Sequence, residues 1–181
     1  PLKSITTGEG GIITTNNNKI ARNIKLFRSH GISKDKNKYW KYDVLEHGYN
    51  YRLSDINCAL GLSQLKKINF FLTERKRIFK NYKFKIKYSK NIQPAFHLFL
   101  ININFEKLKK NKDHFIKYLN KKKILAQQHY IPIYKFKVYK ESRYNFVGSE
   151  KFFKNSVSLP IYVNLKQKEQ NIIIKTIKKY F

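Results

Sequence analysis

The sequence has no methionine, a single cysteine and no long apolar segment. Cys58 alone cannot form a disulfide within the chain, which is typical of a protein from a reducing compartment. No apolar run approaches the ~20 residues that a membrane-spanning helix needs, because runs such as residues 96–101 are only long enough for a strand. No charged segment followed by an apolar one, as in a signal peptide, is visible at the start. We therefore expect a cytoplasmic protein without a membrane partner.

Acidic residues and arginines are also scarce. The chain has 39 basic and 11 acidic residues, a formal net charge of +28, and only six of the basic residues are arginines. Surfaces that bind phosphates or read bases favour the arginine guanidinium. The lysines are spread along the chain together with Asn, Ile, Tyr and Phe, which indicates a compositional bias at exposed positions. We therefore expect no specific nucleic-acid partner.

A basic module that binds nucleic acid or another polyanion is the alternative explanation of the charge. The two explanations differ in what they predict for binding. A dedicated module predicts tight, sequence-selective binding at physiological salt, whereas compositional bias predicts weak binding that salt abolishes.

In the first half of the chain, the pattern predicts one short strand and two helices. The β-branched residues 11–15 are typical of a strand, and residues 16–18 offer an N-cap for a helix that stops at Gly31. Ser54 caps the longest predicted helix, whose apolar face runs from Ile56 to Phe79. Cys58 is expected in the core beneath this helix.

In the second half, strands and helices alternate. Strands are predicted at residues 97–103, 126–130 and 156–160, the last as an edge strand because Pro160 cannot donate a hydrogen bond. Helices are predicted to end near Lys123 and at the carboxyl end of the chain. This alternation indicates the α/β or α+β class.

Most motifs that carry chemistry are missing. Gly8–Gly11 matches neither a dinucleotide fingerprint nor a phosphate-binding loop, and the histidines lack the spacing of metal ligands, so no metal site is expected. Lys3, just ahead of the glycine-rich turn, is the remaining candidate. A lysine nucleophile must be held in place and kept partly neutral, and a stiff turn would hold it. Judged by spacing alone, a lysine beside a turn is typical of a solvated side chain.

Five segments, in order along the chain, resemble one family of enzymes. They are KSITTGEGG, LFRSHGI, GYNYRLSDINCALGLSQLKK, AQQHYIPIY and SLPIY. The resemblance is to the DegT/DnrJ/EryC1/StrS family of sugar-nucleotide aminotransferases, which are fold-type I enzymes dependent on pyridoxal 5'-phosphate. It covers essentially the whole chain. Within the family, these segments are most similar to the branch that makes the 4-amino precursor of pseudaminic acid.

This resemblance implies an α/β fold that is the carboxy-terminal portion of a fold-type I pyridoxal-phosphate transferase. Residues 1–82 would be the end of the large cofactor-binding domain with a long linking helix, and residues 83–181 the small α/β domain. The implied reaction transfers an amino group from glutamate to C4 of a nucleotide-linked 4-keto-6-deoxy sugar. In the pseudaminic acid branch its product is UDP-4-amino-4,6-dideoxy-N-acetyl-altrosamine.

The resemblance also implies roles for five residues. Lys3 matches the lysine that binds the cofactor covalently and shuttles the proton during transfer. Asn50 matches the asparagine that reaches across a homodimer to the cofactor phosphate of the other subunit, so that the active site is shared. Arg52, His129 and Tyr130 match residues near the substrate. The alternatives are a loop cap for Asn50, a surface salt bridge for Arg52, and a packed core pair for His129 and Tyr130.

The sequence departs from the family pattern in one large respect, because it lacks the front half. In the family that half carries the phosphate-binding turn, the aromatic residue that stacks on the cofactor ring, and the carboxylate that pairs with the pyridinium nitrogen. We therefore expect the chain to be a fragment that is inactive alone. A related dehydratase, in which a histidine replaces the lysine, is disfavoured by Lys3.

Overall fold

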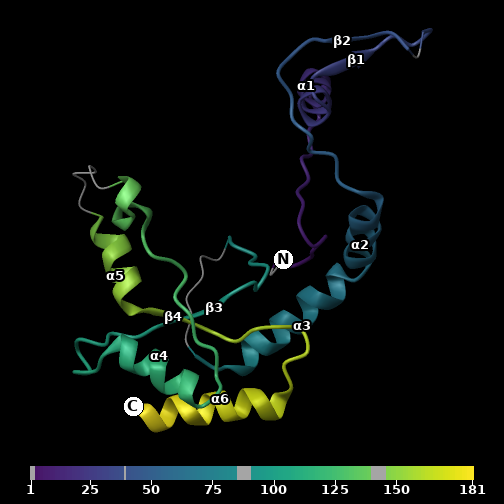
Figure 1. The fold of residues 1–181 in the computed structure, drawn as a ribbon. Helices are drawn as coiled ribbons and strands as arrows, with labels where there is room; N and C mark the ends of the chain where they lie inside the picture. Colours follow the sequence, from purple (N-terminus) through teal and green to yellow (C-terminus); the bar gives the residue numbers. More distant parts are fainter. Residues whose placement is uncertain (1–2, 39, 85–90, 140–145) are drawn as a thin grey trace. The chain divides into compact units, whose positions relative to one another are not determined.

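The computed structural model describes residues 3–38, 40–84, 91–139 and 146–181. The chain forms two compact units, Pro1–Ile68 and Asn69–Phe181 (Figure 1). The helix over residues 68–81, which the sequence analysis placed with the first domain, belongs almost entirely to the second unit. The domain boundary after residue 82 stays a prediction for the protein as a whole.

The first unit contains two helices and a small antiparallel sheet. Asn17 accepts hydrogen bonds from the amides of Lys19 and Ile20, and Ser54 accepts one from Asn57, so both predicted N-caps are confirmed. The elements are α1 (Asn18–Arg28), β1 (Ile32–Lys34), β2 (Tyr42–Val44) and α2 (Asp55–Lys66). In the sheet, Ser33 of β1 lies opposite Asp43 of β2.

Helix α1 ends at Arg28 with Ser29 as its C-cap, so the left-handed C′ position is His30, with φ 61°, and not Gly31 as predicted. Gly31 follows, also left-handed with φ +68°, and its amide donates back to the carbonyl of Leu26 at 2.8 Å.

Two glycines cross at the end of α1. A Cβ atom on Gly31 would lie 1.7 Å from the carbonyl oxygen of Glu46, and one on Gly48 would lie 2.1 Å from the Gly31 nitrogen. The backbone around Gly31 is therefore in direct contact with the backbone of residues 46–48, and only glycine fits at either position.

The glycine crossing leads directly into the segment around Asn50. The amides of Tyr49 and Tyr51 donate to the carbonyls of Phe27 and Arg28 at the end of α1, at 2.7 and 3.0 Å. Asn50 itself forms an isolated antiparallel bridge with Ser29. The end of α1 thus fixes the backbone on both sides of Asn50.

Three expectations for the first unit are wrong. Residues 11–15 form no strand, because no other described segment pairs with them. Cys58 is exposed rather than in a core. The single long helix is two helices, α2 and α3 (Ile68–Asn81), separated at Lys67. On α2 the predicted apolar face is exposed, with Ile56 at 82% and Leu65 at 54%.

The second unit is built around a two-stranded antiparallel sheet of β3 (Phe99–Asn102) and β4 (Ser156–Leu159). These confirm the predicted strands, although β4 is no edge strand, since Gln127 bridges its Ser158 from the other side. The predicted strand over residues 126–130 reduces to that single bridge. The helices are α3, α4 (Lys112–Lys121), α5 (Val147–Asn155) and α6 (Gln167–Tyr180), with two short 3-10 turns, η1 (Ile133–Lys135) and η2 (Lys137–Tyr139).

Each strand gives one face of the sheet to the hydrophobic core. Phe99 lies opposite Leu159, and Ile101 lies opposite Val157, and all four are buried. Directly opposed residues share a face of an antiparallel pair, so these four form one apolar surface. Helices α3, α4 and α6 cover it, together with Tyr82 just beyond the end of α3, and α4 runs beside α6 (Figure 1). The buried residues on these elements are Ile78, Tyr82, Phe115, Leu119, Ile173 and Ile177.

Helix α3 and Tyr82, the residue that follows it, also hold the segment after β4. The hydroxyl of Tyr82 donates to the carbonyl of Pro160 at 2.6 Å, and Nη1 of Arg75 donates to the carbonyl of Ile161 at 3.1 Å. Both side chains are buried, and Tyr82 stacks on Phe99 with ring centroids 4.2 Å apart. Burial raises the pKa of Tyr82, so its hydroxyl stays protonated and remains a donor at neutral pH.

We predict that Gly48→Ala opens the segment around Asn50. The added methyl group would overlap the backbone of residues 30 and 31, and overpacking of this kind costs about 1–3 kcal/mol. Amide hydrogen exchange at Tyr49 and Tyr51 should accelerate by about tenfold or more if that energy is lost locally. Gly11→Ala is the matched control, because nothing lies within 4 Å of its Cβ position. Unchanged exchange in Gly48→Ala would contradict the steric argument.

We predict that Tyr82→Phe destabilises the second unit by about 1–2 kcal/mol, because the Pro160 carbonyl loses its donor in a buried position. The measurement is the midpoint of urea unfolding, followed by circular dichroism. Tyr118→Phe is the control, since the Tyr118 ring packs against the same core and its hydroxyl has no hydrogen bond among the described residues. Equal midpoints for the two variants would show that the Tyr82 hydroxyl contributes nothing.

Candidate active site

Lys3 lies just ahead of a turn that local hydrogen bonds and packing hold in place. Within the turn, the Thr7 hydroxyl donates to the Glu9 carbonyl at 2.9 Å, and the Gly8 amide donates to the Thr6 hydroxyl at 3.1 Å. A Cβ on Gly61 of α2 would lie 2.8 Å from the Thr7 methyl group, so the turn packs closely on that helix. Lys3 is exposed, and its amine makes no hydrogen bond or ion pair within the described part of the chain.

Asn50 and Arg52 lie on one extended segment of the first unit. The rings of Tyr49 and Tyr51 stack with centroids 4.9 Å apart and planes 7° apart. Because successive side chains of an extended segment point to opposite sides, the Asn50 side chain points away from this stack. Asn50 and Arg52 are both exposed. Neither side chain makes a hydrogen bond or ion pair to another described residue.

His129 and Tyr130 lie in the second unit, beside β4. Nδ1 of His129 and Oγ of Ser158 share a hydrogen bond of 2.6 Å. Ser158 is buried, His129 is half-buried and Tyr130 is 65% exposed. The two neighbouring rings meet edge to face, with centroids 4.7 Å apart, across a cis peptide bond. His129 is thus held from one side while Tyr130 faces outward.

A cluster of charged and aromatic side chains anchors the segment that carries His129, and sequence reasoning missed it. Lys135 pairs with Glu150 of α5 at 2.8 Å, and the Tyr134 hydroxyl donates to the same carboxylate at 3.0 Å. The amines of Lys112 and Lys135 lie over the ring of Phe153, 4.4 and 4.8 Å from its centroid. The AQQHYIPIY segment pointed to this region, but no sequence signal distinguished Lys112 from the other lysines.

The charged groups of this cluster titrate away from their ordinary values. Burial lowers the pKa of Lys112; the charge of Asp113 opposes this shift, and the nearby Lys135 adds a smaller lowering effect. The hydrogen bond from Lys135 is the main cause that lowers the pKa of Glu150. Lys112 therefore carries its charge in an unfavourable place, while Glu150 is held in its charged form.

The predicted site residues are divided between the two units. Lys3, Asn50 and Arg52 belong to the first, and His129 and Tyr130 to the second. Within the described residues, no hydrogen bond joins Lys3, Asn50 and Arg52 to one another. The structure defines the local surroundings of each residue. Lys3 precedes a turn held by hydrogen bonds, Asn50 lies beside the end of α1, and His129 lies beside β4.

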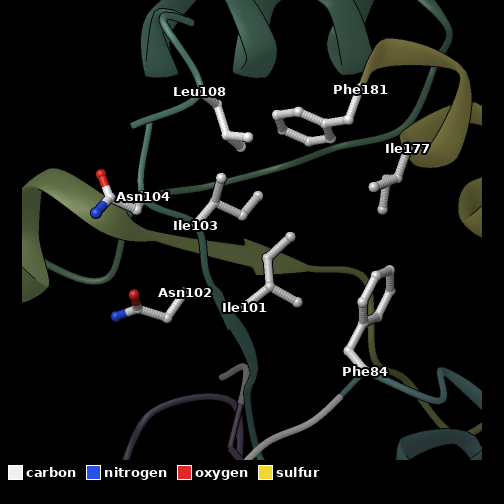
Figure 2. Close-up of a pocket in the computed structure, with 8 residues that line it drawn as sticks. All are labelled: Phe84, Ile101, Asn102, Ile103, Asn104, Leu108, Ile177 and Phe181. Atoms are coloured by element: carbon white, nitrogen blue, oxygen red, sulfur yellow. The ribbon is translucent and has the colours of Figure 1, made fainter. Parts of the chain in front are cut away.

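A separate cavity of about 360 Å³ lies in the second unit, between β3 and α6. Figure 2 shows its apolar wall, from Ile101 to Phe181, with the amides of Asn102 and Asn104 set to one side. No titratable side chain and none of the predicted site residues lines it. The cavity is therefore distinct from the candidate active site.

None of the helices in the described part of the chain is both long and apolar enough to cross a membrane. The same part of the chain contains no group of three or more His, Cys, Asp or Glu side chains placed to hold a metal ion.

Known proteins resemble the chain over nearly its whole length. A Campylobacter jejuni protein named UDP-4-amino-4,6-dideoxy-N-acetyl-beta-L-altrosamine transaminase is 36% identical over 98% of this chain and 49% of its own length. An uncharacterised protein of Methanocaldococcus jannaschii is 34% identical over 98% of this chain and 51% of its own. The chain thus spans about half the length of the relatives it matches.

The fold is also that of a solved structure. Helicobacter pylori PseC, an aminotransferase involved in the biosynthesis of pseudoaminic acid, superposes with a TM-score of 0.88 at 32% identity, over 98% of this chain and 50% of that one. The predicted fold, a portion of an aminotransferase of this type, is confirmed. The model of one family matches residues 1–178, the family that the sequence motifs predicted. The chain belongs to the DegT/DnrJ/EryC1/StrS aminotransferase family.

Proposed function

We propose that this chain is the carboxy-terminal part of a cytoplasmic aminotransferase that moves an amino group from glutamate to C4 of a nucleotide-linked 4-keto-6-deoxy sugar. The product would be UDP-4-amino-4,6-dideoxy-N-acetyl-altrosamine, as the names of its relatives in Campylobacter and Helicobacter suggest. The observation that carries the proposal is Lys3, whose unengaged amine precedes a fixed turn inside the family match.

The residues of this chain fit pyridoxal 5'-phosphate, the cofactor of the family. The aldehyde of the cofactor requires a primary amine, and Lys3 offers an exposed one that has no partner among the residues the structure describes. The cofactor phosphate requires hydrogen-bond donors, and the exposed amide of Asn50 is one. When bound, the cofactor supplies a ring that accepts electrons from the carbon that loses a proton.

Lys3 has two tasks in this proposal. Its Nζ holds the cofactor covalently between reactions. During a reaction the same atom takes the proton from the amino-bearing carbon and returns it at the other end of the transfer. A base of this kind must stay within hydrogen-bond reach of its proton, and the turn packed against Gly61 gives Lys3 a fixed starting point.

The remaining residues bind and orient. Asn50 donates to the cofactor phosphate of a second subunit, which makes the active site a shared property of a homodimer. The Arg52 guanidinium suits a diphosphate or the carboxylate of the amino donor. His129 and Tyr130 line the sugar pocket, where the outward-facing Tyr130 offers a ring and a hydroxyl. The chain alone would be inactive, since the family carboxylate that pairs with the pyridinium nitrogen lies in the other half.

In the complete protein, Lys3→Ala should remove both the bound cofactor and transamination. Borohydride reduction of the unmodified protein, followed by peptide mass spectrometry, should place the cofactor on the peptide that contains Lys3. With ¹⁵N-labelled glutamate, the label should appear in the amino sugar. Lys19→Ala, on the exposed surface of α1, is the control and should keep both properties. An adduct on a different lysine would overturn the role of Lys3.

Mixing two inactive variants tests whether Asn50 acts across the dimer. Lys3→Ala and Asn50→Ala, co-expressed in the complete protein, should recover roughly a quarter of the unmodified activity, because half of randomly paired dimers carry one intact site of two.

The control replaces Asn50→Ala by the double variant Lys3→Ala, Asn50→Ala, which leaves no intact site in any pairing. No recovery in the first mixture, when subunit exchange is demonstrated, would show that Asn50 serves its own chain or has no role at the phosphate.

A further inference from the structure

Lys112 occupies a position that is unfavourable for a cation. It is the first residue of α4, whose amino end carries a partial positive charge from the helix dipole. Its side chain is half-buried, and Lys135 lies nearby over the same aromatic ring. The charge of the adjacent Asp113 acts in its favour, but no carboxylate forms an ion pair with it among the described residues, and Glu150 is paired with Lys135. A charged group that persists in such a place needs strong compensating contacts.

Two oxygens and a ring supply that compensation. The Lys112 amine donates to Oε1 of Gln128 and to the carbonyl oxygen of Phe153, the latter at 2.5 Å. The Gln128 amide completes the triangle, donating from Nε2 to the same Phe153 carbonyl at 3.1 Å. The ammonium also lies over the face of the Phe153 ring. Lys112 thereby joins the start of α4, the end of α5 and the side chain of Gln128.

Gln128 directly precedes His129, so the hydrogen bonds among Lys112, Gln128 and Phe153 affect the position of the residues proposed to bind the substrate. Three successive residues are each fixed by hydrogen bonds of their own. Gln127 pairs with the backbone of Ser158, Gln128 is held by Lys112 and Phe153, and His129 bonds the Ser158 hydroxyl. Tyr130 follows with no hydrogen bond to a described residue, and its ring is exposed. Its position therefore depends on the three residues before it.

We propose that Lys112 is a positioning residue, which through Gln128 sets the place of His129 and Tyr130 in the sugar pocket. This inference rests on the proposed function, in that it takes His129 and Tyr130 as substrate-binding residues. Lys112 itself touches neither of them and has no part in the chemistry.

The first test needs no activity. In the 181-residue chain, the ring signals of His129, assigned with His129→Gln, are followed by NMR. Lys112→Met keeps the stem of the side chain and removes its donors, and it should shift the His129 signals. Gln128→Met should shift the His129 signals in a similar way. The double variant Lys112→Met, Gln128→Met should shift them little further, because both substitutions remove the same hydrogen bond between Lys112 and Gln128.

The second test uses the complete enzyme. Lys112→Met should raise KM for the nucleotide sugar about tenfold, the loss expected from hydrogen bonds to a charged group, with kcat changed much less. Lys112→Arg should restore part of the loss. Lys117→Met, on the exposed surface of the same helix, is the matched control. Ile173→Val, a core substitution outside residues 127–130 that lowers the free energy of unfolding by about 1 kcal/mol, controls for a general loss of stability.

The outcomes separate this inference from the proposed function. Unchanged His129 signals in folded Lys112→Met would overturn the link between Lys112 and His129. Shifted signals with an unchanged KM would overturn its role in substrate binding. If the unmodified complete protein does not aminate the nucleotide sugar, the proposed function fails, and the NMR comparison still decides whether Lys112 positions His129.

Discussion

The second unit depends on Ser158, which forms hydrogen bonds through both its backbone and its side chain. Its backbone exchanges hydrogen bonds with Gln127 at 2.8 and 3.1 Å, and its hydroxyl bonds His129. The side chains of β4 alternate, so Val157 and Leu159 enter the core while Ser156 and Ser158 face the other side. A shift in register by one residue would turn serines into the core and apolar side chains toward His129. The strand that closes the core through its pairing with β3 therefore also places His129.

The first unit is held differently, because it has almost no core of its own. Gly31 is its one buried residue among those described, and its apolar side chains, such as Ile12 and Ile56, are 88% and 82% exposed. Its order comes from capped helices, the glycine crossing, and hydrogen bonds between backbone segments. Apolar surface left in water on this scale is typical of a surface that another part of a protein covers. The family match to half of a longer protein accounts for this.

Local signals predicted local structure well. The N-caps at Asn17 and Ser54, the left-handed Gly31 and the helix at the carboxyl end all follow from rules that involve a few neighbouring residues. The failures concern partners. Residues 11–15 have the β-branched composition of a strand, but no described segment pairs with them. Cys58 lies among apolar residues in the sequence, but its side chain is exposed. The site showed the same split: Lys3 and His129 were found through motifs, whereas Lys112 matters only because folding brings it to Gln128.

The composition explains why the anchoring cluster takes the form it does. With 39 basic and 11 acidic residues, most lysines have no carboxylate available, and two ion pairs occur among the described residues. The chain is rich in aromatic residues, and three lysines lie over aromatic rings: Lys110 over Tyr180, and Lys112 and Lys135 over Phe153. Of these, Lys135 also has a carboxylate partner, Glu150. Lys112 adds a carbonyl and an amide oxygen, which are neutral acceptors. An acid-poor chain can thus still place a cation in a partly buried site, provided that helix ends and amide side chains turn their oxygens toward it.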